Sequence, residues 1–258
     1  MANIALRAAR RAGELIVRAS DDLDRIAVRS KHANDFVSDV DEEAEKEIIR
    51  QLRRTYPDHA FLGEESGRDG AEDAEYTWVI DPLDGTTNFL RGIPHFGVSI
   101  ACMHRGRVEH AVVVDPIRRE EFVASRGRGA QLNGRRMRVS KLAGLEGALL
   151  GTGVPFKGHE DERLDTYARG LADLAGQCAG IRRAGAASLD LAYVAAGRLD
   201  AFWEYGLSIW DIAAGVLLIR EAGGLVADID GSDAYLESGN IVCGNPKCFK
   251  AVLQSLHR

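Results

Sequence analysis

The chain has 258 residues, of which 45% are hydrophobic and 28% charged, so it can bury a core without disulfides or a structural metal. Its net charge of −6 disfavours binding to DNA or to an anionic membrane by charge alone. No apolar run is long enough for a membrane span or a signal peptide, and the four cysteines lack zinc-site spacing. We therefore expect a cytoplasmic protein with reduced cysteines and no membrane partner.

Two helices are predicted at the start of the chain. Residues 4–19 are amphipathic, and a second helix follows Asp41, where apolar residues recur every three or four positions. Residues 38–41 provide a start of the capping-box kind. Pro57 is expected to end this second helix.

Short apolar runs in the middle of the chain predict an antiparallel sheet, with strands at residues 78–80, 97–102, 111–114 and 121–124. The first of these strands is expected to stop at Asp81 and Pro82. Farther on, helical patterns cover residues 162–175, 188–196, 209–222 and 246–256. Short strands are predicted between them, at residues 200–203, 224–227 and 240–243. This order indicates an α+β or α/β protein whose sheets are covered by helices.

Two carboxylates stand three positions apart where the strand at residues 78–80 ends. Asp81 and Asp84 surround a proline turn that can aim both side chains at one point, and Gly85 permits a tight bend. Thr86 then opens a short helix, whose free backbone N–H groups can bind a phosphate. Cation ligands beside an anion site are the layout that metal-assisted phosphate chemistry requires. Each aspartate alone is also an ordinary turn residue, so the inference depends on the whole segment.

Three further acids are less informative when each is taken alone. Glu64 lies in a polar stretch that a solvated loop would explain. Asp211 stands in the first turn of an apolar helix, where it would complement the helix dipole. Capping explains part of the pattern around Asp41.

Together these segments resemble the successive motifs of the inositol monophosphatase family. Its motifs are matched in order and at similar separations by residues 35–41, 63–66, 78–89 and 210–215, and farther matches lie at residues 185–200 and 221–224. The likeness covers essentially the whole chain and is greatest to the bacterial SuhB-type members. It implies a layered α-β-α-β-α sandwich forming a single domain over residues 1–258. A metal and phosphate half would span about 1–145, and a sugar-side half about 146–258.

The resemblance also implies a metal centre. Its ligands would be the carboxylates of Glu64, Asp81, Asp84 and Asp211 and the carbonyl of Leu83. Oxygen donors without His or Cys select hard cations, so Mg²⁺ is expected, with more than one ion per site and Mn²⁺ as a substitute. The catalytic residues would be Asp41, Glu64 and Thr86. In this scheme Asp41 accepts a hydrogen bond from the Thr86 hydroxyl, and Glu64 positions or deprotonates the attacking water.

The implied reaction is hydrolysis of a myo-inositol monophosphate, or a similar polyol phosphate, by metal-activated water. Gly85 and Thr86 would hold the phosphate through backbone N–H groups, and Glu204 would accept hydrogen bonds from polyol hydroxyls. All expected substrate contacts are Glu64, Leu83, Asp84, Gly85, Thr86, Gly185, Ala186, Ala187, Glu204 and Asp211. One departure concerns substrate identity, because many family members carry serine where this chain has Ala186.

Two alternatives remain open. Related phosphatases act on fructose bisphosphate or nucleotide 3′-phosphates, although Glu204 favours a neutral polyol over a second phosphate. SuhB-type proteins are also associated with transcription antitermination and ribosomal RNA maturation, which would make RNA polymerase factors the partners and phosphatase activity secondary. A homodimer and lithium sensitivity are further implications of the resemblance. The basic pairs at residues 135–136 and 182–183 are interpreted as solvated or interface charges.

Overall fold

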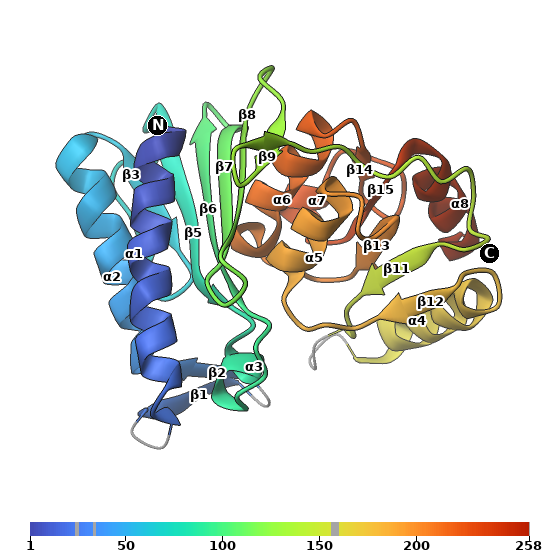
Figure 1. Cartoon of the computed structure of the whole chain (residues 1–258), viewed down its shortest axis with the longest axis horizontal. Coiled ribbons are helices and arrows are strands. Elements are labelled where there is room, and N and C mark those ends of the chain that lie inside the picture. The colour runs from blue at the N-terminus through green and yellow to red at the C-terminus, as the bar shows by residue number, and fades with distance from the viewer. Residues whose placement is uncertain (24–25, 33–34, 156–159, 258) are drawn as a thin grey trace.

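The computed structural model describes residues 1–23, 26–32, 35–155 and 160–257, and it arranges them in five layers (Figure 1). Helices α1 and α2 lie outside an eight-stranded sheet, α5 and α6 lie between the sheets, and α4 and α8 cover the five-stranded sheet. The predicted α-β-α-β-α sandwich is therefore confirmed. Within the described part of the chain, no helix combines the length and apolar character needed to cross a membrane.

The first two layers are α1 (Ala2–Ser20) and α2 (Asp39–Thr55) packed on the eight-stranded sheet. The apolar faces of both helices join one hydrophobic cluster with Trp78, Ile80 and Ile100 of the sheet. The strand order is β10 (Arg135–Arg136), β9 (Ala130–Leu132), β8 (Glu120–Ser125), β7 (Arg107–Asp115), β6 (Gly97–His104), β5 (Tyr76–Asp84), β3 (Ala60–Gly63) and β4 (Gly67–Asp69). From β5 to β10 the neighbours are antiparallel, as predicted for β5 to β8, whereas β3 and β5 are parallel.

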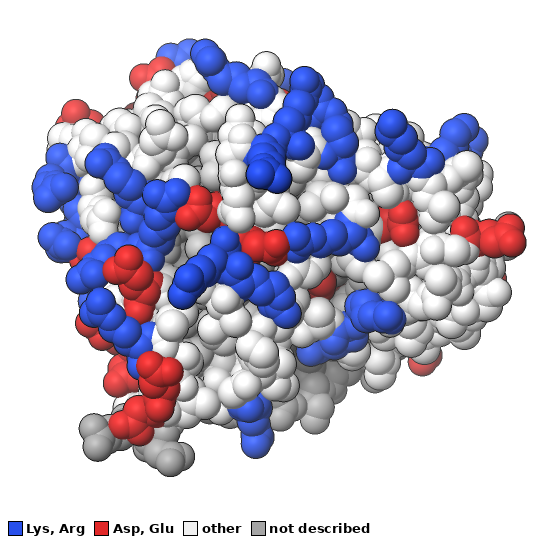
Figure 2. All heavy atoms as spheres, viewed as in Figure 1, with Lys and Arg blue, Asp and Glu red and all other residues white. Residues whose placement is uncertain are grey.

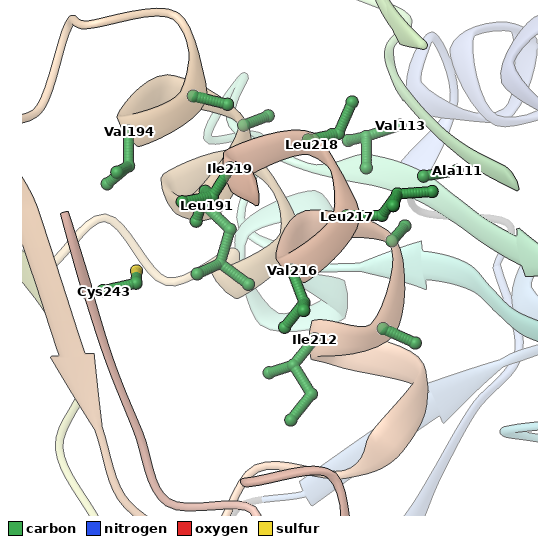
Figure 3. Packing of buried hydrophobic residues seen from close by; sticks show 14 of the residues in the cluster. Ala111, Val113, Leu191, Val194, Ile212, Val216, Leu217, Leu218, Ile219 and Cys243 are labelled. Carbon is green, nitrogen blue, oxygen red and sulfur yellow. The ribbon is translucent and has the colours of Figure 1, made fainter. Parts of the chain in front are cut away.

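The central layer consists of α5 (Ala187–Ala195) and α6 (Ile209–Glu221), which are apolar on nearly every side. A helix of that composition must be buried all round, and both sheets supply the cover. Figure 3 shows Leu217 and Leu218 of α6 beside Ala111 and Val113 of β7, and all four residues belong to one hydrophobic cluster. Cys243, on the five-stranded sheet, joins the same cluster.

The five-stranded sheet has the order β12 (Gly180–Arg182), β11 (Leu149–Thr152), β13 (Ala201–Glu204), β15 (Ile241–Gly244) and β14 (Leu225–Ala227). Its outer side is covered by α4 (Glu160–Ala175) and α8 (Pro246–Leu256). Asn245 caps α8 by accepting hydrogen bonds from the backbone N–H groups of Lys247 and Cys248. The smaller elements are β1 (Val28–His32), β2 (Asp35–Ser38), α3 (Thr86–Leu90) and α7 (Tyr235–Ser238).

The long predicted helices are all present, and in the second half their ends lie within two residues of the predicted positions. The predictions missed β1 and β2, β3 and β4, and β9 to β12. These strands have two to five residues each, too few for an alternating pattern to be recognised. β1 with β2, β3 with β4, and β9 with β10 pair antiparallel with near neighbours in the sequence, so only their short length hides them. β11 instead pairs with the distant strands β12 and β13, so the residues around it carry little signal.

Close contact between α5 and α6 depends on Gly215. A Cβ atom at this position would lie 2.5 Å from Leu191 Cβ, closer than real side chains approach. We expect Gly215→Ala to lower the free energy of unfolding by about 1–3 kcal/mol, because the added methyl forces the two helices apart. Urea unfolding followed by circular dichroism measures this change.

The matched control is Gly144→Ala, because a Cβ at Gly144 meets no atom within 4 Å. Equal unfolding midpoints for the two variants would show that the α5–α6 contact tolerates a methyl group.

Candidate functional site

A bulge in β5 brings Asp81 and Asp84 toward one point. The strand does not stop after Ile80, as the sequence predicted, but continues to Asp84. Asp81 pairs with Ser99 and Asp84 with Gly97, so three steps along β5 match two along β6. In a regular strand, residues three positions apart point to opposite faces, and the extra residue removes that alternation. The proline turn inferred from the sequence is thus a bulge within a paired strand.

Asp211 reaches the same point from the first turn of α6. It forms a capping box with Ser208, whose backbone N–H donates to Asp211 Oδ2 at 2.7 Å. One carboxylate oxygen from each of Asp81, Asp84 and Asp211 lies within 4.8 Å of the other two. A set of oxygen donors from three carboxylates suits a hard divalent cation.

Glu64 completes the acidic group from the end of β3. Its backbone N–H donates to the Ile80 carbonyl at 3.1 Å, which continues the parallel pairing of β3 with β5. Parallel strands end at the same edge of a sheet, so the residues that follow β3 emerge beside Asp81. The Glu64 carboxylate is close enough to Asp81 to help raise the pKa of that aspartate.

The pKa values of the aspartates show what this crowding costs. Burial and then the neighbouring carboxylates raise the pKa of Asp81 and of Asp211 well above the usual range. Burial raises the pKa of Asp84 to about 6, although hydrogen bonds from Ser188 oppose the shift. Two like charges 4 Å apart repel by about 4 kcal/mol at an effective dielectric of 20. A divalent cation would remove that repulsion, so the donor set and its electrostatics both fit a metal.

Asp41 and Thr86 form a hydrogen-bonded pair beside this group. Asp41 is fully buried in the first turn of α2, and its Oδ2 accepts from the backbone N–H and the hydroxyl of Ser38. Its Oδ1 lies 2.9 Å from Thr86 Oγ1. Thr86 Oγ1 is also 3.0 Å from the Leu83 carbonyl, so its single proton can go to either acceptor. The structure therefore brings the predicted pair together and places the Leu83 carbonyl next to it.

The remaining predicted residues line a cavity beside Asp84 and Asp211. Gly185, Ala186, Ala187 and Glu204 face this hollow, which encloses about 410 Å³ of space partly open to solvent. Glu204 ends β13 and is only 6% exposed, and a Cβ at Gly153 would lie within 2 Å of its carboxylate. Burial raises the pKa of Glu204 well above its usual range. Residues far apart in sequence thus form one wall.

Gly85, in the predicted phosphate segment, packs closely against Gly185 and Ala186 of the predicted sugar segment. Its φ of +91° is in the left-handed region, and a Cβ there would lie 3.1 Å from the His95 carbonyl oxygen and 3.2 Å from Ala186 Cβ. The side-chain amide of Asn88, in α3, donates to the carbonyls of His95 and Ala184. The predicted phosphate segment is therefore tied to the predicted sugar segment.

Sequence reasoning missed three residues of this site. Asp190 is 3% exposed and lines the cavity, and burial raises its pKa well above the usual range. Arg183, interpreted as a solvated or interface charge, lines the same cavity and lowers the pKa of Glu204. Ser188 donates to Asp84 Oδ2 from both its backbone N–H, at 2.7 Å, and its hydroxyl. A lone acid in the apolar helix 187–195 was the signal that could have identified Asp190.

Comparisons with known proteins agree with this geometry. The model of the inositol monophosphatase family matches residues 1–258. The "Nus factor SuhB" of Pseudomonas aeruginosa is 64% identical over 258 residues, which cover 99% of this chain and 95% of that protein. The crystal structure of extragenic suppressor protein suhB from Bartonella henselae superposes with a TM-score of 0.96 at 43% identity, covering 99% of this chain and 98% of that one. An inositol monophosphatase from Anabaena has a TM-score of 0.88 at 36% identity, with 99% and 94% covered.

The pKa of Asp84 leads to a prediction for the metal-free protein. From about pH 4 to 6 the unfolded chain releases this proton while the folded chain retains it, so stability falls as the pH rises. The difference between the ordinary pKa of 3.8 and about 6 corresponds to about 3 kcal/mol of unfolding free energy, which is lost in full above pH 6. We expect the free energy of unfolding of Asp84→Asn, taken relative to that of wild type, to rise by about 3 kcal/mol between pH 4 and pH 7. Urea unfolding in the presence of a chelator measures it.

The prediction concerns how the difference in unfolding free energy between the two proteins changes with pH. A pH-independent effect of the asparagine does not alter that change. Parallel stability profiles for the two proteins across pH 4–7 would contradict the raised pKa of Asp84.

Proposed function

Because the chain belongs to the inositol monophosphatase family, we propose that it hydrolyses a polyol phosphate monoester, with a myo-inositol monophosphate as the first candidate. One observation carries the proposal: Asp84 and Asp211 belong both to the acidic group that suits a metal and to the wall of the cavity that contains Glu204. A phosphate near the acids would therefore place its alcohol group in the cavity.

The metal would be held by the carboxylates of Glu64, Asp81, Asp84 and Asp211 and by the Leu83 carbonyl. The donors are all oxygen, so Mg²⁺ is the proposed ion and Mn²⁺ a substitute. A bound divalent cation would withdraw electron density from the phosphate and from the attacking water. The neighbouring backbone holds the acids in place, since Asp81 accepts from Leu83 N–H, Asp84 from Ser188 N–H and Asp211 from Ser208 N–H.

Asp41 and Thr86 would orient the attacking water. Both hydrogen bonds from Ser38 go to Asp41 Oδ2, which leaves Oδ1 to accept the Thr86 hydroxyl at 2.9 Å. When Thr86 donates to Asp41, its oxygen lone pairs are free to accept a hydrogen bond from water. Glu64, whose side chain adjoins Asp81, would accept the proton that the water loses.

The cavity would select the alcohol. Gly85 and Thr86 would hold the phosphate through backbone N–H groups. Behind them the carboxylates of Glu204 and Asp190 share the wall with one guanidinium, that of Arg183. Carboxylates accept hydrogen bonds from hydroxyls and repel a second phosphate, so this composition favours a neutral polyol over a bisphosphate.

The first test is phosphate release from inositol 1-phosphate with and without Mg²⁺, for wild type and Asp84→Asn. Loss of one carboxylate from the metal ligands should lower Mg²⁺-dependent turnover by at least about 100-fold, more than the usual effect of removing an outer partner. Asp73→Asn, which changes an exposed acid before β5, should keep wild-type turnover.

The same assay separates the alternatives within the phosphatases. Turnover of fructose bisphosphate or a nucleotide 3′-phosphate in place of inositol 1-phosphate would reassign the substrate. A folded wild type that is inert on the whole panel would refute the enzymatic proposal.

We also propose a second role in transcription antitermination, because a relative 64% identical over the full chain carries the name Nus factor. An uneven charge distribution favours contact with RNA. Residues 105–141 contain ten Lys and Arg against four Asp and Glu, although the whole chain has a net charge of −6. This segment forms β7 to β10, and Figure 2 shows Lys and Arg side chains gathered where Figure 1 places β8 and β9.

Several of these arginines are available for a partner. Among the described residues, Arg128, Arg135 and Arg136 form no salt bridge. The turn before β9 is held rigid, since the Glu221 carboxylate accepts hydrogen bonds from the backbone N–H groups of Gly127 and Gly129. Guanidinium groups on a rigid edge strand and turn suit contacts with phosphates.

The triple variant Arg128→Gln/Arg135→Gln/Arg136→Gln should bind a labelled single-stranded RNA more weakly than wild type. Three lost phosphate contacts should reduce the slope of log affinity against log salt by about 2, as fluorescence anisotropy can measure. Phosphatase turnover should not change.

The matched control removes three arginines that already have carboxylate partners, Arg11, Arg50 and Arg53, whose partners are Glu14, Glu47 and Asp69. Equal losses in both triple variants would mean that only net charge matters and would refute a dedicated surface.

A further inference from the structure

A buried carboxylate on α2 supports the turn that carries Glu64. Glu45 is 2% exposed and belongs to the buried face of α2, where its neighbours Ala44 and Ile48 are apolar. Its Oε2 accepts a hydrogen bond from the backbone N–H of Glu65 at 3.0 Å, and its Oε1 accepts one from Ser66 at 2.8 Å. Both oxygens of the carboxylate are therefore directed at the turn, and the hydrogen bonds compensate for its burial.

The neighbouring residues fit this arrangement closely. A Cβ at Gly63 would lie 2.3 Å from Glu45 Oε2, so only glycine leaves room for the carboxylate beneath the turn. The N–H of Glu64 itself donates to the Ile80 carbonyl at 3.1 Å. Three successive backbone N–H groups, those of residues 64, 65 and 66, thus have fixed partners. The backbone position of Glu64 is therefore fixed by the hydrogen bond of its own N–H and by those of the two N–H groups that follow it.

Glu45 also lies one helical turn after Asp41, on the same face of α2. Asp41 contacts the Thr86 hydroxyl, and Glu45 contacts the turn of Glu64. One rigid helix therefore sets the position of two separate parts of the site. A site built this way needs little rearrangement when a ligand arrives.

We propose that Glu45 is a positioning residue, which holds the turn at residues 64–66 so that the Glu64 carboxylate stays beside Asp81. This inference rests on the proposed phosphatase function, in which Glu64 is both a metal ligand and the acceptor of the water proton. Without Glu45 the turn loses both acceptors, and Glu64 can move away from the aspartates. Metal affinity and the rate of the chemical step should then fall together.

Glu45→Gln tests the proposal, because glutamine keeps the size of the side chain but has only one oxygen to accept the two N–H groups. We expect Mn²⁺ affinity, measured by titration calorimetry on the whole protein, to fall by about 10–100-fold. At saturating Mg²⁺ the kcat should fall while KM for the polyol phosphate stays unchanged, since the cavity around Glu204 is untouched. Glu47→Gln, on the same helix and paired with the exposed Arg50, should match wild type in every measurement.

Gly63→Ala provides a second route to the same contact if Glu45→Gln folds poorly. The added methyl would displace the Glu45 carboxylate while leaving its charge in the protein. Both changes act through one contact, so their double variant should weaken Mn²⁺ binding no more than the stronger single change does.

The outcomes separate the two proposals. A lower unfolding midpoint with Mn²⁺ affinity and kcat unchanged would make Glu45 a purely structural residue and overturn the inference. Wild-type protein that binds Mn²⁺ but hydrolyses no substrate would refute the phosphatase function, while the affinity of Glu45→Gln would still decide the positioning role. Weaker Mn²⁺ binding in Glu45→Gln and in Gly63→Ala, with Glu47→Gln unaffected, supports the positioning role of Glu45.

Discussion

Mutual repulsion among buried carboxylates is the constraint around which this molecule is organised. Glu64, Asp81, Asp84 and Asp211 meet at one edge of the eight-stranded sheet, where burial and their neighbours raise the pKa of the three aspartates. Such a group does not stay together through its own contacts. Each aspartate is held by at least one backbone N–H, and the scaffold supplies the energy that keeps like charges close.

Most of those N–H groups lie at the starts of helices. Asp41 and Asp211 close capping boxes on α2 and α6, and Asp84 accepts from Ser188 in the first turn of α5. The positive end of a helix dipole favours a nearby carboxylate. For Asp41 and Asp211, a role at the start of a helix and a place in the candidate site are therefore compatible, although the sequence presented them as alternatives. The same hydrogen bond that begins a helix also aims a potential ligand.

Residues from both sheets line the same cavity. Glu204 ends β13 in the five-stranded sheet, whereas Asp84 ends β5 in the other. The apolar helices α5 and α6 fill the space between the sheets, and the tight contact at Gly215 sets their separation. Because α6 carries Asp211 and α5 begins beside Asp84, packing in the central layer and geometry of the site cannot vary independently.

The sequence alone determined the long helices, the antiparallel run from β5 to β8 and which acids to examine as a candidate site, because periodicity, capping and short motifs are local properties. It also supported the family and its layered fold. Only the tertiary structure decided that β5 bulges between Asp81 and Asp84, that Arg183 and Asp190 face the cavity, and that Glu45 supports the turn of Glu64. These features depend on register against β6 and on contacts between distant segments. A carboxylate on the buried face of a helix carries no local sign of its partner, since that partner is the backbone of a turn twenty residues away.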